Sequence, residues 1–319
     1  MTTPLRRCRE SRLTQPSHAR SAGQLLRWFE ELEQRICLSC EGLSILSTLT
    51  TTASSAPVTL VDDMPSSLGP SPSLVQSRQL INANAFASNA SFAGIDGRGY
   101  SVAVLDTGID VNHPFFGPDL DANGIDDRIV YQWDFADNDA DATDVSGHGS
   151  NVSSIIGSQD ATYKGIAPGV NIIALKVFSN TGSGSFGSIE KALQWVSANA
   201  AAYNIASVNM SLGDSGNYNT AQTLYGINDE LAALAAQNVI VVSAAGNSYF
   251  TYQTQGVSYP AADPNSLAVG AVWDGNNGAV TWSSGAKDFS STADQITSFS
   301  QRSTSQVDVF APRRVHHRR

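Results

Sequence analysis

A chain of 319 residues, of which 41% are hydrophobic, is long enough to bury a large core as one domain with additional segments. The formal net charge is −10, and residues 42–312 alone carry eight Lys and Arg against 24 Asp and Glu, a net charge of −16. This acidic balance argues against a nucleic-acid partner. Because the chain contains no run of 18 apolar residues, we expect no membrane-spanning helix.

The first 77 residues differ in composition from the rest. Residues 1–41 are rich in Arg and Glu and contain all three cysteines, so we interpret them as a leader, with targeting as one role. Within it, Leu32–Ser39 resembles LEPR-x-LL, a short N-terminal motif of extracellular proteins, which favours an extracellular or cell-envelope location. Residues 42–77 are rich in Ser, Thr and Pro, a composition typical of a linker.

From about residue 78, short apolar runs alternate with helical patterns. The expected buried strands, each bounded by turn residues, are Ser101–Leu105, Ile172–Phe178, Ile205–Met210, Val239–Ser243 and Ser266–Val272. Apolar stripes at helical spacing comprise Ile189, Leu193, Val196 and Ala200, and then Leu224, Ile227, Leu231 and Leu234. This alternation predicts an α/β fold with a doubly wound, mostly parallel sheet and helices on both faces.

Functional residues of such sheets collect where strands end, and two polar residues occupy such places. Asp106 follows the first expected strand, and Asn247 follows the fourth. His148 lies between two glycines and precedes a helix expected over Asn151–Ile156. A buried carboxylate beside an imidazole is the arrangement that makes histidine a general base. Each signal alone is ambiguous, since a strand-end Asp can cap a helix or form a turn, and a His between glycines can be a loop residue.

Six segments, in this order, resemble the motifs of the subtilisin-like (S8) serine peptidases. They are Val102–Pro114 around Asp106, Gly147–Val152 around His148, Val208–Gly213, Ser243–Asn247, Tyr259–Ala261, which the family usually builds as a cis-proline turn, and Phe299–Pro312. The resemblance is collinear over about residues 78–312, which we therefore predict to be a peptidase domain. One departure lies beside His148, where Ser150 and Asn151 replace the usual Thr and His.

The resemblance implies that Asp106 orients the base, that His148 is the base, and that Asn247 donates its amide to the oxyanion. It also implies that a polypeptide substrate binds in an extended conformation as an added strand. The residues with this implied substrate-binding role are Gly182, Ser183, Gly184, Ser211, Leu212 and Gly213. Asn247 could instead cap a helix, and the residues from Ser211 could form a simple turn. Those from Gly182 follow G-x-G-x-x-G, a nucleotide-binding pattern, although no acidic residue ends the next strand.

The nucleophilic serine of this family lies in a G-T-S-M-A-x-P motif, and no segment of the 319 residues matches it. The resemblance breaks at Arg313, and residues 313–319 form an aberrant basic tail. We therefore expect a serine-endopeptidase lineage whose domain is incomplete at its C-terminus, and we expect this chain to be inactive. Two alternatives are a non-catalytic, peptide-binding pseudo-protease and a non-functional gene fragment.

The chemistry implied by the resemblance requires no cofactor, but one loop suggests a structural calcium ion. Asp119, Asp121, Asn123 and Asp127 follow the spacing of a calcium-binding loop, in which carboxylate and amide oxygens are the ligands. Val130 stands where such a loop has its bidentate Glu. A solvated acidic surface loop would have the same composition.

Overall fold

The structure is a computed structural model that describes residues 54–60 and 74–313. The predictions made for residues 1–41, for most of 42–77 and for the tail beyond Arg313 lie outside the described residues. Among the described helices, none is both long enough and apolar enough to cross a membrane.

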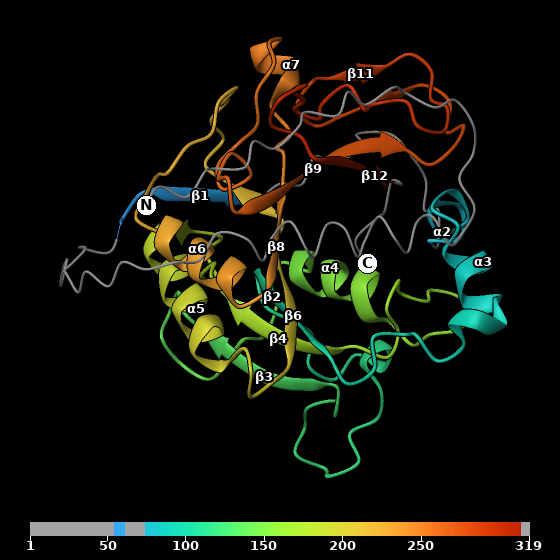
Figure 1. Cartoon of the computed structure of the whole chain (residues 1–319), viewed down its shortest axis with the longest axis vertical. Helices are drawn as coiled ribbons and strands as arrows, with labels where there is room; N and C mark the ends of the chain where they lie inside the picture. The colour runs from blue at the N-terminus through green and yellow to red at the C-terminus, as the bar shows by residue number, and fades with distance from the viewer. Residues whose placement is uncertain (1–53, 61–73, 314–319) are drawn as a thin grey trace, which may run out of the picture. The chain divides into compact units, whose positions relative to one another are not determined.

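A parallel seven-stranded sheet forms the centre of the domain (Figure 1). Its order is β12-β9-β8-β6-β2-β4-β3, and every neighbouring pair is parallel. The strands are β2 (Ser101–Asp106), β3 (Ile129–Asp134), β4 (Asn171–Lys176), β6 (Ile205–Met210), β8 (Ile240–Ala244), β9 (Ser266–Trp273) and β12 (Val309–Arg313). The chain builds first on one side of β2 and then on the other, so the strand order reverses at β2. Ligands of open α/β sheets bind at the carboxyl ends of the strands beside such a reversal.

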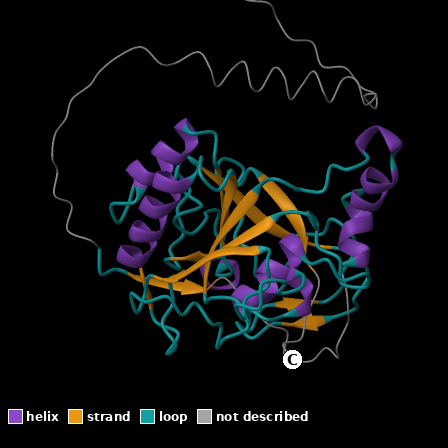
Figure 2. Cartoon of the chain, turned by 90° about the horizontal axis from the view of Figure 1, so that it is seen from below, coloured by secondary structure: helices purple, strands orange, loops and turns teal. Residues whose placement is uncertain are grey.

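Both faces of the sheet are buried. Successive side chains of a strand point to opposite faces, so neighbouring residues of β2 belong to different cores. Ala103 and Leu105 belong to a core that includes residues of two helices, whereas Val104 belongs to a second core that includes residues of a third. These helices are α5 (Phe186–Asn199), α6 (Asn228–Ala236) and α4 (His148–Gly157), in that order. Figure 2 shows helices on both sides of the sheet. The doubly wound α/β prediction is confirmed.

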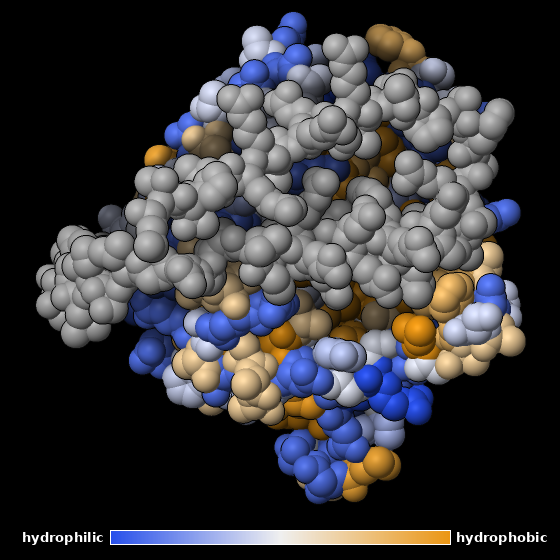
Figure 3. Space-filling view, in the orientation of Figure 1, coloured by the Kyte–Doolittle hydropathy of each residue, from blue (hydrophilic) through white to orange (hydrophobic). Residues whose placement is uncertain are grey.

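Shorter elements surround this centre. They are α2 (Val75–Leu80), α3 (Ala83–Ser88), η1 (Ala90–Phe92), η2 (Pro114–Phe116), α7 (Tyr249–Tyr252), β10 (Val280–Thr281) and β11 (Lys287–Asp288). A third buried cluster, which contains Trp273, Trp282 and Phe299, packs next to β9. On the part of one face that Figure 3 leaves uncovered, hydrophilic and hydrophobic residues are interspersed. A surface of this kind is normal for a globular domain.

Two helices begin at residues that the sequence did not indicate. α6 starts at Asn228 because Tyr225 and Gly226 have φ angles of 59° and 80°, which an α-helix does not contain. Leu224 and Ile227 therefore precede the helix, although both pack on the same core. The other helix, α4, begins at His148 rather than three residues later, so the histidine belongs to the helix and not to the loop before it.

One predicted strand differs from the structure by more than one residue at its end, and two strands of the central sheet were not predicted. The strand expected over Ile172–Phe178 ends at Lys176. β3 and β12 were not predicted as strands, and both lie at the edges of the sheet. Most residues of these two strands are only half-buried or exposed. An edge strand therefore lacks the continuous apolar run by which the central strands were identified.

Residues 57–60 fall in the segment predicted as linker, yet they form the strand β1 (Pro57–Leu60). This strand is the middle of a separate three-stranded antiparallel sheet, between β5 (Gly184–Ser185) and β7 (Leu212–Gly213). Its partners lie far along the chain, and pairing through the backbone requires few apolar side chains. The composition of the segment therefore could not indicate the strand.

Candidate active site

Asp106 and His148 form a buried hydrogen-bonded pair. His148 Nδ1 lies 2.7 Å from Asp106 Oδ1, and the two side chains expose 6% and 1% of their surfaces. Asp106 is the last residue of β2, and His148 is the first residue of α4, which packs against β2. When the proton of a neutral imidazole is on Nδ1 and points to a carboxylate, Nε2 carries the basic lone pair. The geometry therefore suits a histidine that accepts a proton through Nε2.

The start of α4 approaches the end of β2 so closely that residue 149 must lack a side chain. A Cβ on Gly149 would collide with the carbonyl oxygen of Gly108 and would lie 3.1 Å from Asp106 Oδ1. Gly108 has a φ of 113°, a conformation that favours glycine. The glycine after the histidine thus has a steric function, which is to let the imidazole reach the carboxylate.

A second carboxylate, Asp144, organises the start of α4, and sequence reasoning missed it. Its Oδ1 accepts hydrogen bonds from the backbone N–H groups of Ser146 and Gly147, at 2.9 and 2.8 Å, and from the Thr107 hydroxyl at 2.9 Å. Its Oδ2 accepts from the N–H and the hydroxyl of Ser150, at 2.9 and 2.7 Å. Burial alone would raise the pKa of Asp144, but these bonds outweigh burial and hold the pKa below its ordinary value. An Asp just before a helix is a capping signal that could have identified it.

Asn247 lies beyond the end of β8, on the side of the sheet at which the parallel strands have their carboxyl ends. Asp106 lies on the same side. β8 neighbours β6, and β6 neighbours β2, so the carboxyl ends of three parallel strands lie side by side. Gln301 holds the loop that contains Asn247. Its backbone N–H donates to the carbonyl of Gly246 at 2.8 Å. Gln301 Oε1 accepts the N–H of Ser248 at 3.4 Å. The sequence indicated Asn247 but not the supporting Gln301.

The six residues with an implied substrate-binding role lie on either side of β1. β5 pairs with one edge of β1 and β7 with the other, both in antiparallel orientation. Gly182 and Ser183 lead into β5, and Ser211 comes directly before β7. We call the position between β5 and β7 the strand site. Its two edges offer backbone groups to an extended chain from both sides, which is the geometry of peptide recognition by strand addition.

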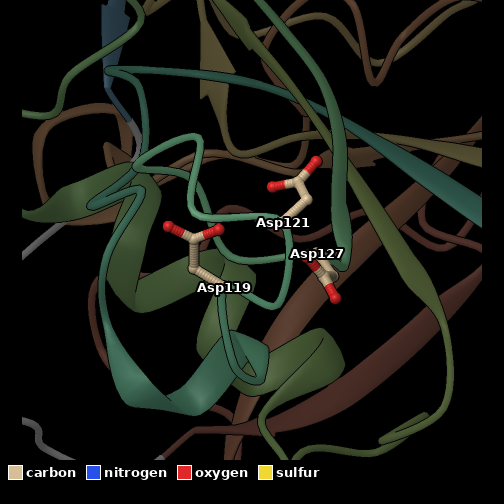
Figure 4. A group of neighbouring side chains, drawn as sticks. All are labelled: Asp119, Asp121 and Asp127. Atoms are coloured by element: carbon tan, nitrogen blue, oxygen red, sulfur yellow. The ribbon is translucent and has the colours of Figure 1, made fainter.

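Three carboxylates of the predicted calcium loop lie together. Asp119, Asp121 and Asp127 each offer an oxygen, and these atoms lie within 4.8 Å of one another (Figure 4). The side chain of Asn123 is used within the loop, because its amide donates to Asp121 at 3.1 Å and its oxygen accepts a backbone N–H at 2.8 Å. A backbone hydrogen bond within the loop is the main cause that lowers the pKa of Asp119. Carboxylate oxygens are ligands that Ca²⁺ prefers, so the three aspartates fit a cation.

A buried ion pair lies one strand away from Asp106, and sequence reasoning missed it as well. Lys176 Nζ lies 2.8 Å from Asp134 Oδ2, and both side chains expose 2% of their surfaces. Lys176 also donates to Asn180 Oδ1 at 2.6 Å, and it is the β4 partner of Asp106 in the sheet register. The pair joins the carboxyl ends of β3 and β4 and so supports the side of the sheet on which Asp106 lies.

The turn Tyr259–Pro260 contains a cis peptide bond.

Comparisons with known proteins agree with this arrangement. The profile of the subtilase family (peptidase S8) matches residues 97–314. The chain is 33% identical to alkaline serine exoprotease A of Vibrio alginolyticus over 221 residues, which is 69% of this chain and 33% of that protein. It is 30% identical to subtilisin DY of Bacillus licheniformis over 200 residues, which is 62% of this chain and 65% of that protein.

A solved structure of a cold-adapted subtilisin-like serine proteinase is also similar. It superimposes with a TM-score of 0.50 at 32% identity, over 69% of this chain and 65% of that one. The chain thus spans between one third and two thirds of the length of these relatives.

Proposed function

Because the chain belongs to the subtilase family of serine peptidases, we propose that its domain serves the hydrolysis of peptide bonds, with Asp106 and His148 as the carboxylate and the base. The observation that carries the proposal is the buried contact of 2.7 Å between His148 Nδ1 and Asp106 Oδ1. His148 Nε2 takes the proton of an attacking serine hydroxyl and later gives it to the leaving amine. Asp106 stays ionised and stabilises the imidazolium that forms in between.

We assign Asn247 to the oxyanion of the tetrahedral intermediate. Its place beyond β8, on the same side of the sheet as Asp106, supports this role. A donor that points at the developing negative charge stabilises the transition state more than the ground state, and its loss costs about 3–4 kcal/mol in subtilisin itself. An extended polypeptide substrate would lie in the strand site, with its backbone paired to β5 and β7.

The serine itself is the part of the machinery that these residues do not supply. No segment of the 319 residues matches G-T-S-M-A-x-P, and we propose that residues 1–319 by themselves do not cleave peptides. A site that lacks its nucleophile keeps only what binding and the remaining oxyanion donors provide, about 10³–10⁴ over the uncatalysed rate in subtilisin. Residues 78–312 would then form the larger part of a peptidase domain.

A fluorogenic peptide assay tests the proposal. Residues 1–319 should show no turnover that a serine-directed fluorophosphonate blocks. Extension of the chain with a segment that carries G-T-S-M-A-x-P should produce such turnover, His148→Ala should abolish it in the extended chain, and the control His113→Ala should retain it. Blocked turnover by residues 1–319 would refute the missing nucleophile. A folded but inert extended chain would refute the roles given to Asp106 and His148.

A second candidate function is peptide binding without cleavage. The observation that favours it is the strand site itself, which already pairs with an extended segment on both edges. Isothermal titration of residues 1–319 with extended peptides measures this function directly and requires no nucleophile. Saturable binding together with an inert extended chain would favour it over hydrolysis.

Two further features belong to the proposal. Asp119, Asp121 and Asp127 would hold a calcium ion that stabilises the loop before β3 and takes no part in the chemistry. This loop lies at the bottom of Figure 1 and is mostly hydrophilic in Figure 3.

An extracellular or cell-envelope location suits the acidic composition, and fractionation of cells that express the chain would test it.

A further inference from the structure

The side chain of Gln301 joins two loops of the candidate site. Residues 246–248 form one of them, which we call the oxyanion loop because it contains the proposed oxyanion donor. Gln301 is 0% exposed, and its Oε1 accepts the backbone N–H of Ser248 at 3.4 Å. Its Nε2 donates to the carbonyl of Gly216 at 2.9 Å and to Asn217 Oδ1 at 2.8 Å, in the loop that follows β7. One buried amide therefore links the oxyanion loop to the substrate-binding edge.

The contacts fix which way round this amide lies. An amide oxygen accepts hydrogen bonds and an amide nitrogen donates them, so the reversed amide would turn its oxygen toward two acceptors, the Gly216 carbonyl and Asn217 Oδ1. Asn217 is itself held, because its Nδ2 donates to Thr254 Oγ1 at 3.1 Å and to the carbonyl of Gln255 at 3.3 Å. The amide of Gln301 therefore has one favourable orientation, which presents Oε1 to the oxyanion loop.

The backbone of Gln301 is anchored separately from its side chain. Its N–H donates to the carbonyl of Gly246 at 2.8 Å. Its carbonyl accepts the hydroxyl of Ser300 at 3.1 Å, and the same hydroxyl accepts the N–H of Ala271 in β9 at 2.9 Å. A Cβ on Gly246 would collide with Gln301 Oε1, so the oxyanion loop approaches the amide this closely only because residue 246 is glycine. The amide thus extends from a fixed point beside the central sheet.

A carboxylate holds the other end of the link. Asp214, the residue directly after β7, accepts the N–H of Gly216 on Oδ1 at 2.8 Å. The same oxygen accepts the hydroxyl of Ser258 and the N–H of Tyr259, both at 3.0 Å. Gly216 is therefore bonded through its N–H to Asp214 and through its carbonyl to Gln301. The loop after β7 cannot shift without breaking one of these bonds.

We propose that Gln301 is a positioning residue that sets the place of Asn247 relative to a peptide paired with β7. The proposal rests on the proposed function, because it takes Asn247 as the oxyanion donor and β7 as one edge of the strand site. A donor of this kind works only when it points at the oxygen that becomes charged, and a misplacement of about 1 Å can cost about a hundredfold in rate. Gln301 itself touches no reacting atom and acts through Asn247.

NMR of the full chain tests the link without any need for catalysis. The probe is the pair of side-chain NH₂ resonances of Asn247 in protein labelled with ¹⁵N-asparagine, assigned by their loss in Asn247→Ala. Gln301→Met keeps the length of the side chain but has no donor and only a weak acceptor, so it should shift these resonances. Gln255→Met makes the same exchange at an exposed residue and is the matched control, which should leave them in place.

The variant Gln301→Glu adds a rescue that depends on pH. A protonated carboxyl keeps an acceptor for Ser248 and one donor for Gly216, whereas an ionised carboxylate has acceptors alone. Burial raises the pKa of such a carboxyl, and so does the nearby charge of Asp214. Arg302, the next residue, is turned away to the ring of Tyr249 and to two backbone carbonyls.

The resonances of Asn247 in Gln301→Glu should accordingly match those of the unchanged chain at pH 5 and move away from them at pH 9. The unchanged chain and Gln255→Met should show no such movement. A residue that only stabilised the fold would lower the melting temperature when replaced and leave the Asn247 resonances of the folded chain where they are. If Gln301→Met does not fold, the two pH values of Gln301→Glu decide the question alone.

Kinetics of the chain extended with the serine motif give a second measurement. With active sites counted by fluorophosphonate titration, Gln301→Met should lower kcat by about tenfold to a hundredfold and change KM by less than about threefold. Gln255→Met should retain both constants. The count of active sites separates this effect from a loss of folded protein.

The two failures can be told apart. Unmoved Asn247 resonances in folded Gln301→Met, or no return of Gln301→Glu at low pH, would overturn the positioning role whatever the activity. Resonances that move as expected in an extended chain that is inert would support the placement of Asn247 by Gln301 and overturn the proposed hydrolysis.

Discussion

The hydroxyl of Thr107 connects the end of β2 to Asp144. Thr107 Oγ1 lies 2.9 Å from Asp144 Oδ1 and accepts the backbone N–H of Gly149 at 2.9 Å. The same oxygen lies 3.2 Å from Asp106 Oδ1. Since a hydroxyl has one proton, donation to Asp144 leaves Asp106 Oδ1 to the backbone N–H of Thr107, at 2.7 Å, and to His148. Asp144 therefore acts on the Asp106–His148 pair through the orientation of one hydroxyl.

Removal of the charge at Asp144 should destabilise the domain. We expect Asp144→Asn to lower the free energy of unfolding by about 2–3 kcal/mol at pH 7, because an NH₂ group replaces one acceptor oxygen that receives several hydrogen bonds. The pKa of Asp144 is lowered in the folded chain. Its contribution is therefore present above the unfolded-state pKa, near 3.8, and is lost as the pH falls through the lower folded-state pKa. Urea unfolding at several pH values measures both effects. The exposed control Asp137→Asn should change little, and an equal loss in the two variants would contradict the role of Asp144.

Glu230 should make the domain less stable in mild alkali. It is buried in α6 and accepts a hydrogen bond from Gln194 at 2.9 Å, and burial is the main cause that raises its pKa to about 7. The folded chain therefore holds a proton that the unfolded chain has released. The stabilisation is full below about pH 4.5 and is lost as the pH rises through about 7. Glu230→Gln should thus raise the free energy of unfolding at pH 8 by about 1–3 kcal/mol.

Thermal unfolding at pH 5 and pH 8 tests this effect, and the exposed variant Asp294→Asn is the control for removal of a charge. If Glu230→Gln raises the melting temperature equally at both pH values, titration of Glu230 is not the cause of the change.

Replacement of Gly149 by Ala should cost stability even though alanine is the better helix former. Propensity alone would favour the variant by up to about 1 kcal/mol, but the added Cβ collides with the carbonyl oxygen of Gly108. Overpacking of this kind costs about 1–3 kcal/mol. Urea unfolding of Gly149→Ala should therefore show a net loss. Gly275→Ala, where a Cβ meets nothing within 4 Å, is the control. A stabilised Gly149→Ala would show that α4 and the end of β2 are not in close contact.

Calcium should raise the melting temperature. A ligand at one hundred times its dissociation constant adds about 2.7 kcal/mol to the stability of the folded state. We expect melting curves with calcium and with a chelator to differ, and Asp121→Asn to remove most of the difference. Asp137→Asn, which lies outside the carboxylate cluster, should preserve it. Coincident curves for the unchanged chain, with no heat of calcium binding by calorimetry, would exclude the site.

The parts of the fold that could be predicted from sequence are those with strong local patterns. The central strands, such as Ile205–Met210, are buried on both faces and therefore appear as apolar runs. The edge strands β3 and β12 do not, because most of their side chains are only partly buried. The boundary of α6 was missed because a helical stripe continues through Tyr225 and Gly226, whose positive φ angles are a property of the backbone.

The residues of the candidate site also divide into those that the sequence indicates and those that it does not. Asp106, His148 and Asn247 were found because they lie in motifs that resemble those of a family. Gln301 and the ion pair of Lys176 act through bonds to segments far away in the sequence, and no local pattern encodes such distant bonds. Asp144 differs, because most of its hydrogen bonds are to residues at the start of α4, close in the sequence, and only its bond to Thr107 is distant.

The pairing of β1 has a consequence for the order in which the domain forms. Thr59 and Gly213, which the three-stranded sheet brings together, are 154 residues apart in the chain. Ribosomes add about 5–20 residues per second, so the last partner of β1 is made roughly 8–30 s after β1 itself. Throughout this interval the strand lacks at least one of the two neighbours that complete its hydrogen bonding. Its docking is therefore a late event in biosynthesis, and it can occur only after both edges of the strand site exist.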